Sequence, residues 1–246
     1  MTTTRSGEGP ATTTKTSATR TDITIILDRS GSMVPRHAEV IRSFNDLLAE
    51  QRAVPGKAKI SLVQFDNEYE SVYRGVKLAD APNLTPDTYV PRGTTALLDA
   101  VGRTIKDTEA RLRRRARKRR EKGREIDDPR VLVVVVTDGL ENASTDHTLE
   151  QVRAEITRQE TDWNWSFVFL GAGLDAFAQS HGMGMASGRA MRMGASGKAW
   201  NRSMGVVSAK MRLMRSLDRE ASMGQVRSAL EFTDEERQEA KDRAGE

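Results

Sequence analysis

Residues 131–136 read VLVVVV, an apolar run in which every residue but one is a β-branched valine. Such a run is typical of a central strand in a parallel sheet, because helices cover both faces of that strand. The dipeptide Asp128-Pro129 breaks the chain before the run, and the sequence TDG at 137–139 follows it. The run therefore predicts a buried strand whose carboxyl end leads into a polar loop.

Other apolar runs accompany this strand along the chain. Three further strands are predicted, from ITIIL at 23–27, KISLVQF at 59–65 and WSFVFLGAG at 165–173. The segment NEYESVYRGVKL at 67–78 is expected to turn back as an antiparallel edge strand. Helices are predicted between strands from the one-face spacing of Val40, Ile41, Phe44, Leu47 and Leu48, and of Leu97, Val101 and Ile105. This alternation predicts an α/β fold: a doubly wound, mainly parallel sheet flanked by helices, with one antiparallel edge strand.

The length of the chain favours one domain with tails. Its 246 residues with 37% apolar content are enough for one well-filled hydrophobic core but too few for two independent domains of ordinary size. We expect a disordered Thr- and Ser-rich tail at 1–20, one domain at 21–217 and a charged tail at 218–246. The last tail is expected to be partly helical, because Thr233 and Glu236 form a capping-box pattern. A core-covering helix is predicted from the stripe Trp200, Met204, Val207, Met211 and Met214.

The composition excludes several classes of site. The chain has no cysteine, which excludes disulfides, thiolate metal sites and cysteine nucleophiles. It has neither the roughly 18 to 20 consecutive apolar residues that span a bilayer nor an apolar secretory segment at its N-terminus. We therefore expect a soluble protein, cytoplasmic by default, that does not bind membranes.

Positive charge is concentrated in one segment. From Arg111 to Arg124 the sequence RLRRRARKRREKGR has ten Lys or Arg and one Glu, a local charge of +9, so the net charge of +4 leaves −5 on the other 232 residues. We interpret residues 111–124 as a solvated helix end or loop. The alternative is a contact with nucleic acid or an acidic protein, which would depend on salt and not on sequence.

Side chains with oxygen atoms follow the first predicted strand. In an extended segment alternate residues face the same side, so Asp28, Ser30 and Ser32 can present three oxygens to one point. One carboxylate and two hydroxyls suit a small hard cation such as Mg²⁺ and are poor ligands for zinc. Other oxygen donors at the same sheet edge are Asp138 and either Thr94 or Thr95. These side chains can converge if the strands that precede Asp28 and Asp138 are neighbours.

The three motifs together resemble a known family. They resemble the metal-ion-dependent adhesion site (MIDAS) of a von Willebrand factor A domain. The matching motifs, in this order, are DRSGS at 28–32, GTT at 93–95 and TDG at 137–139. The resemblance covers about residues 20–215. It implies binding of Mg²⁺, or of Mn²⁺ or Ca²⁺, by the residues Asp28, Ser30, Ser32, Thr94 and Asp138, the last acting mainly through water.

The choice between the two threonines is open. Thr94 directly follows Gly93, as the first threonine does in family loops of the form G-T-x-T, and we assign the ligand to it. The second threonine of that pattern is absent, and Thr95 is adjacent instead. Thr95 is therefore the alternative ligand.

The resemblance also implies a function. In this family a Glu or Asp of a partner protein commonly completes the coordination of the metal. We therefore expect a metal-dependent protein-interaction module, of the intracellular bacterial or phage type, with an ATPase chaperone as one possible class of partner. The alternative is a nucleic-acid-associated protein that binds through residues 111–124 and has a purely structural metal.

We do not expect an enzyme. A phosphatase of the haloacid dehalogenase type needs a second aspartate two residues after the first, where this chain has Ser30. The hydrolase elbow G-x-S-x-G is also absent at Ser30. The histidines, His37, His147 and His181, are expected to be surface or packing residues and not catalytic bases.

Overall fold

The computed structural model describes residues 20–126 and 128–241, without the side chains of 173–177. The disordered tail expected at 1–20 lies, apart from Arg20, outside the described residues. Within the described residues the strands are β1 (Thr21–Asp28), β2 (Ala58–Phe65), β3 (Tyr69–Lys77), β4 (Arg130–Thr137), β5 (Ser166–Ala172) and β6 (Ala190–Met193). The α-helices are α1 (His37–Ala53), α2 (Leu97–Glu121), α3 (Leu149–Asp162), α4 (Gly173–Gly182), α5 (Gly197–Ser216), α6 (Met223–Leu230) and α7 (Asp234–Glu239).

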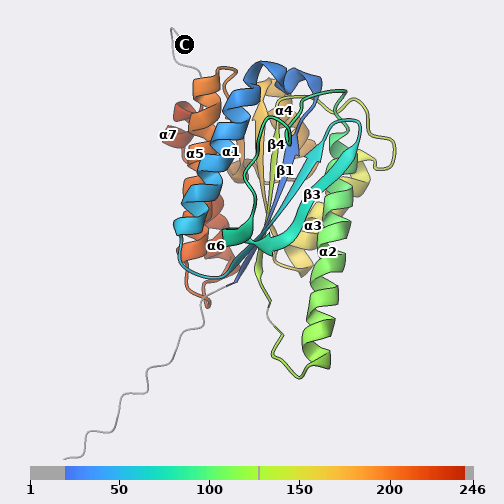
Figure 1. The fold of residues 1–246 in the computed structure, drawn as a ribbon, viewed down its shortest axis with the longest axis vertical. Helices are drawn as coiled ribbons and strands as arrows, with labels where there is room; N and C mark the ends of the chain where they lie inside the picture. The colour runs from blue at the N-terminus through green and yellow to red at the C-terminus, as the bar shows by residue number, and fades with distance from the viewer. Residues whose placement is uncertain (1–19, 127, 242–246) are drawn as a thin grey trace, which may run out of the picture.

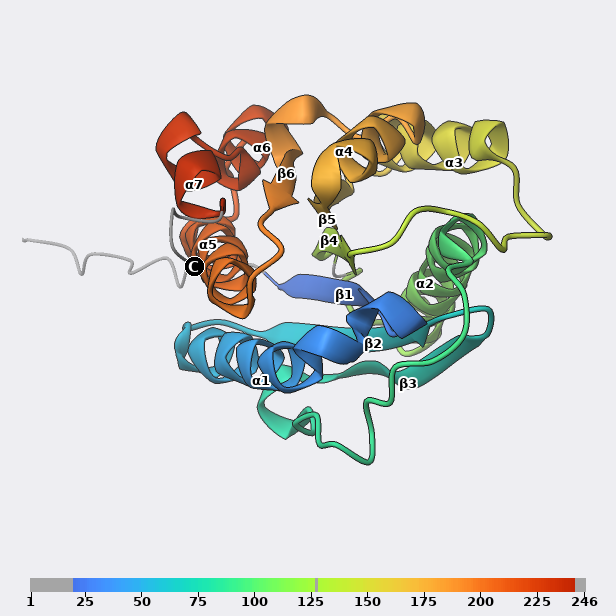
Figure 2. The same cartoon turned by 90° about the horizontal axis from the view of Figure 1, so that it is seen from above.

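The strands form one sheet in the order β3-β2-β1-β4-β5-β6. Strand β1 pairs in parallel with β2 and β4, and the pairs β4–β5 and β5–β6 are parallel as well. At one edge, β3 runs antiparallel to β2. Helices α1, α5, α6 and α7 cover one face of the sheet, and α2, α3 and α4 cover the other (Figures 1 and 2). The predicted doubly wound, mainly parallel sheet with one antiparallel edge strand is confirmed.

The run VLVVVV forms β4 and is buried on both faces. Its even-numbered residues, from Leu132 to Val136, pack in the apolar cluster beneath α1 and α5. Its odd-numbered residues, from Val131 to Val135, pack in a second cluster beneath α2 and α3. The central position of β4 therefore follows from its lack of a polar face.

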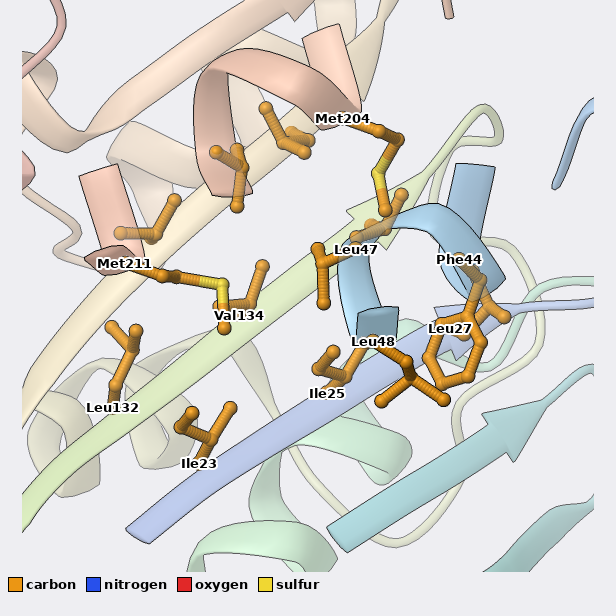
Figure 3. Packing of buried hydrophobic residues seen from close by; sticks show 14 of the residues in the cluster. Ile23, Ile25, Leu27, Phe44, Leu47, Leu48, Leu132, Val134, Met204 and Met211 are labelled. Carbon is orange, nitrogen blue, oxygen red and sulfur yellow. The ribbon is translucent and has the colours of Figure 1, made fainter. Parts of the chain in front are cut away.

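The cluster beneath α1 and α5 holds the two helices against the sheet. Figure 3 shows Ile23, Ile25 and Leu27 of β1 beside Leu132 and Val134 of β4, with α1 and α5 packed over them. The predicted stripe forms the buried face of α5, with the residues Trp200, Met204, Val207, Met211 and Met214.

The C-terminal segment contributes to this core. The charged tail expected from residue 218 onward is partly helical, as α6 and α7, and Thr233 accepts from the Glu236 backbone N–H in the predicted capping box. However, Val226 and Leu230 of α6 are buried with Phe232 in the cluster beneath α1 and α5. The core thus extends past residue 217, because α6 has an apolar face that the sequence analysis did not identify.

Strand β6 has no counterpart among the elements predicted from the sequence. It has four residues, one of them the exposed Arg192. Among the residues that the structure describes, none of the helices combines the length and the apolar character needed to cross a membrane.

Candidate metal centre

The predicted ligands lie at the carboxyl edge of the sheet, the end that faces the viewer in Figure 2. Strand β1 ends at Asp28, and the chain then forms a short 3₁₀ helix, Gly31–Arg36, before α1. Strand β4 pairs with β1 as its neighbour, with Leu27 opposite Val136. The strands before Asp28 and Asp138 are therefore adjacent, which is the condition that the sequence analysis set.

Asp28 is held in place by several hydrogen bonds. Its side chain is fully buried, and one carboxylate oxygen accepts the Thr137 hydroxyl at 2.5 Å while the other accepts the Ser30 backbone N–H at 2.6 Å. Burial raises the pKa of Asp28, and the hydrogen bonds from Thr137 and Ser30 oppose that rise. The Tyr89 hydroxyl donates to the Asp28 carbonyl oxygen at 2.7 Å. The carboxylate therefore has a fixed orientation at the end of its strand.

The other predicted acidic ligand, Asp138, joins the same group of oxygens. The hydroxyls of Ser30 and Ser32 are 3.0 Å apart, and the Ser32 hydroxyl donates to one oxygen of Asp138 at 2.5 Å. This chain of contacts crosses from the loop after β1 to the loop after β4. The structure thus brings Asp28, Ser30, Ser32 and Asp138 together.

Of the two threonines, Thr95 faces the centre. Thr95 is buried, whereas Thr94, to which the sequence analysis assigned the ligand, is exposed. A Cβ placed on Gly139 would lie 2.8 Å from the Thr95 hydroxyl oxygen and 3.6 Å from Oδ2 of Asp28, so both side chains border this glycine. The Asn142 side chain accepts the Thr95 backbone N–H at 2.9 Å, which fixes the loop before α2. The geometry therefore favours Thr95 as the threonine of the centre.

A buried carboxylate connects the two loops that flank the centre. Asp66, at the carboxyl end of β2, is fully buried and accepts from Nε of Arg29 at 3.0 Å and from Nε of Arg92 at 2.9 Å. The Gly31 N–H also donates to the Gly93 carbonyl at 3.1 Å. The sequence analysis missed this network, although Asp66 directly follows a predicted strand at the same sheet edge, as Asp28 does.

Arg36 is a second residue that the sequence analysis missed. Its guanidinium forms an ion pair with Asp138, donates to the Ala195 carbonyl at 3.1 Å and lies 5.7 Å from the ring centre of Trp200. No periodic pattern in the sequence points to these contacts, which join the loop before α1 to α5. Arg36 thus places a positive charge directly beside the candidate ligands.

The donor set fits a hard divalent cation. Within the described ranges no group of three or more His, Asp or Glu side chains is arranged to hold a metal. Metal binding at this edge would rest instead on two carboxylates and the hydroxyls of Ser30, Ser32 and Thr95. Such an all-oxygen set with few carboxylates suits Mg²⁺, Mn²⁺ or Ca²⁺, which keep water molecules as further ligands.

Comparison with known proteins places the fold in a family. The sequence profile of the von Willebrand factor type A domain matches residues 22–190. None of the curated protein sequences compared with the chain matches it. A solved structure of proximal thread matrix protein 1 from the mussel byssus, with a zinc-occupied MIDAS motif, is similar at a TM-score of 0.53 and 16% identity, over 78% of this chain and 45% of that chain.

Two other solved structures are similar. The von Willebrand factor type A protein from Catenulispora acidiphila has a TM-score of 0.53 and 13% identity, over 79% of this chain and 43% of that chain. The manganese-loaded TRAP protein of Plasmodium vivax has a TM-score of 0.50 and 16% identity, over 77% of this chain and 72% of that chain.

The two kinds of comparison carry different weight. At these identities the solved structures support the fold alone, and this chain spans less than half of the mussel and Catenulispora proteins. The profile match covers more than half of the chain and includes both Asp28 and Asp138. The chain belongs to the von Willebrand factor type A domain family.

Proposed function

We propose that the chain is a protein-interaction module that binds an acidic side chain of a partner through a divalent cation. The observation that carries this proposal is the convergence of five oxygen-bearing side chains at one sheet edge: Asp28, Ser30, Ser32, Thr95 and Asp138. Mg²⁺ is the first candidate, with Mn²⁺ and Ca²⁺ as the other choices. The zinc-occupied mussel structure and the manganese-loaded Plasmodium structure support a divalent cation at such a site.

The charges around the centre favour an anionic partner. The two carboxylates of Asp28 and Asp138 would balance a dication, but Arg36 already pairs with Asp138. A dication at this edge would thus keep net positive character, and a Glu or Asp from another protein would reduce it. Such a bond strengthens as water is excluded from the interface.

We propose that the module is not catalytic. Nε2 of His37, the histidine nearest to the ligands in sequence, lies 2.7 Å from the Tyr89 carbonyl oxygen, and its ring stacks on that of Tyr89. His147 lies beside Asp99, with Nδ1 at 3.2 Å from a carboxylate oxygen. These contacts support a packing role for both histidines, as the sequence analysis expects.

Metal binding and partner binding can be tested on the full chain. Titration calorimetry with Mg²⁺, Mn²⁺ and Ca²⁺ measures the first, and retention of host proteins on the immobilised chain measures the second. Asp28→Asn should lose both. Asp80→Asn is the matched control, because it removes one exposed carboxylate in the turn after β3, at the end of the sheet opposite the candidate ligands.

The outcomes separate the proposal from its alternative. Retention that requires Mg²⁺ and is lost in Asp28→Asn supports the proposal, and an ATPase chaperone among the retained proteins would fit the family resemblance. Retention that survives both EDTA and Asp28→Asn contradicts it and leaves any metal with a structural role. The cytoplasmic location and the bacterial or phage origin stay predictions.

A further inference from the structure

The basic segment of the chain forms one wall of a groove at the opposite end of the sheet. Helix α2 has 25 residues and continues past the ends of the strands (Figure 1). Its last turns, the segment after it and the nearby ends of β2 and β3 border a cavity of about 410 Å³. We call this cavity the cationic groove.

The lining of the groove is almost entirely cationic. Among the described residues, nine Lys or Arg side chains line it, from Lys59 of β2 to Arg124 beyond α2. The acidic residue among them, Asp107, is already occupied, because Arg74 pairs with it at 3.3 Å. The remaining lining residue is Gly75. The groove thus has an excess of positive charge, and none of its described lining residues offers an apolar anchor.

A buried ion pair fixes the position of the groove. Asp22 of β1 is fully buried and accepts two hydrogen bonds from the Arg111 guanidinium, at 2.8 and 2.6 Å. Gly75 makes room for that guanidinium, since a Cβ there would lie 2.8 Å from Nη1 of Arg111. Arg111 therefore anchors α2 to the sheet and is not itself available to a ligand.

The Lys and Arg residues that follow Arg111 lie on two different sides of α2. Arg114, Lys118 and Lys122 face the groove at intervals of four residues, and within the described part of the chain their side chains make no ion pair or hydrogen bond. On the other side, Arg113 pairs with Glu109 at 2.6 Å and Arg117 pairs with Glu121 at 3.5 Å. The side of α2 that carries Glu109 and Glu121 is thus partly neutralised, whereas the groove side keeps its charge.

We propose that the cationic groove binds the phosphate backbone of a nucleic acid, without reading its sequence. The row from Arg114 to Lys122 covers two helical turns, about 12 Å. Successive phosphates of one strand advance about 3.4 Å along a duplex, so the row spans several of them. Arginine forks also match phosphate oxygens in pairs.

The lining argues against an acidic protein as the ligand. Tight protein interfaces depend on buried aromatic or aliphatic anchors, and none of the described lining residues is aromatic or a large aliphatic residue. The absence of aromatic residues from that lining also argues against base stacking. Binding through phosphates alone should be independent of sequence and steeply dependent on salt.

The test is fluorescence anisotropy with labelled single- and double-stranded oligonucleotides, on the full chain, over a range of salt concentrations. The groove variant is Arg114→Gln/Lys118→Gln. The matched control is Arg113→Gln/Arg117→Gln, which removes the same charge from the same helix on its other face. We expect the groove variant to lose affinity on the order of tenfold or more, and its salt slope to fall by about 1.4 to 1.8.

Several results would overturn the proposal: no binding by the unchanged chain, equal losses in the two variants, or equal affinity for polyglutamate, which would indicate an acidic protein. Thermal melting checks that each variant folds. Lys122→Gln, beyond the last residue of α2, gives a second groove variant that leaves the helix sequence intact. Asp28→Asn should bind the oligonucleotides normally, so this proposal and the metal-dependent one fail separately.

Discussion

Among the described residues, the charged side chains at the two ends of helix α2 are arranged differently: those near its first turn are paired, and several near its last turns are not. Before its first turn lies the candidate metal centre, where Asp28 accepts from Thr137 and Asp138 pairs with Arg36. Around its last turns, Arg114 and Lys118 face the groove without an ion-pair partner within the described residues. Under the two proposals, the first end binds its ligand through fixed geometry and the second through the amount of charge. Loss of one group should therefore be decisive at the first end and graded at the second.

The largest expected effect is at Asp28. Mg²⁺ at about 100 times its dissociation constant should raise the free energy of unfolding of the wild-type chain by about 2.7 kcal/mol. This gain should disappear in Asp28→Asn. The variant keeps the size of the side chain but removes its charge. Urea denaturation with and without Mg²⁺ measures the gain, and Asp80→Asn should retain it. A normal gain in Asp28→Asn would remove the distinction between the two ends of α2.

The threonine loop provides the next test. Thr95→Val should weaken Mg²⁺ binding about 10- to 100-fold, because it replaces a hydroxyl that borders Gly139 beside Asp28 with a methyl group. Thr94→Val makes the same chemical change on an exposed residue and should leave the affinity unchanged. Titration calorimetry compares the two. The reverse result would restore Thr94 as the ligand.

Alanine substitutions at two glycines test how firmly Arg111 is held at the groove. Gly75 has a φ of +56° and lies against Arg111, whereas Gly123 has a φ of +59° with open space around it. Alanine at either site adds backbone strain of about 1–3 kcal/mol, so the excess cost of Gly75→Ala reports the contact with Arg111. We expect an excess of about 1 kcal/mol in urea denaturation, a weaker affinity for oligonucleotides and unchanged Mg²⁺ binding. Equal costs would show that Arg111 adjusts freely.

The smallest effect is expected at Glu109, on the side of α2 that contacts Arg158 of α3. Hydrogen bonds from Arg158 lower the pKa of Glu109 below its usual value. A lowered pKa in the folded state means that the pair stabilises the protein above the unfolded pKa, and that this gain is lost as the pH falls through the folded one. Glu109→Gln should thus cost about 0.5 kcal/mol at neutral pH and nothing in strong acid. Urea denaturation across pH measures this, and a cost independent of pH would contradict it.

The sequence predicts the sheet because its strands carry their own burial pattern. VLVVVV has no polar face and can only be central, and β1 ends in DRSGS where the alternation of an extended chain brings Asp28, Ser30 and Ser32 to one side. The pairing of β1 with β4 then brings Asp138 to the same edge. These steps need only the order and direction of strands.

The remaining features depend on contacts that no local pattern encodes. Arg36 contacts Asp138 and Ala195 in two other loops, and Arg29 contacts Asp66, which directly follows the neighbouring strand β2. The position of Thr95 depends on how the loop before α2 meets Asn142. Apolar residues of α6 are spaced within an otherwise charged segment, so their burial follows from packing against α5 and not from composition.

The contact between Arg36 and Trp200 should make the candidate metal centre visible to fluorescence spectroscopy. Trp200 is fully buried, donates from Nε1 to the Ser43 hydroxyl at 3.1 Å, and has the guanidinium that pairs with Asp138 over its ring. A nearby charge shifts the emission of an indole, so any event that moves Arg36 should change the fluorescence of this tryptophan. The other two tryptophans are Trp163, which is half exposed beside Arg113 of α2, and Trp165, which is buried in the cluster beneath α2 and α3. Replacing both with phenylalanine would isolate the Trp200 signal. The protein would then report on its own centre without an attached dye.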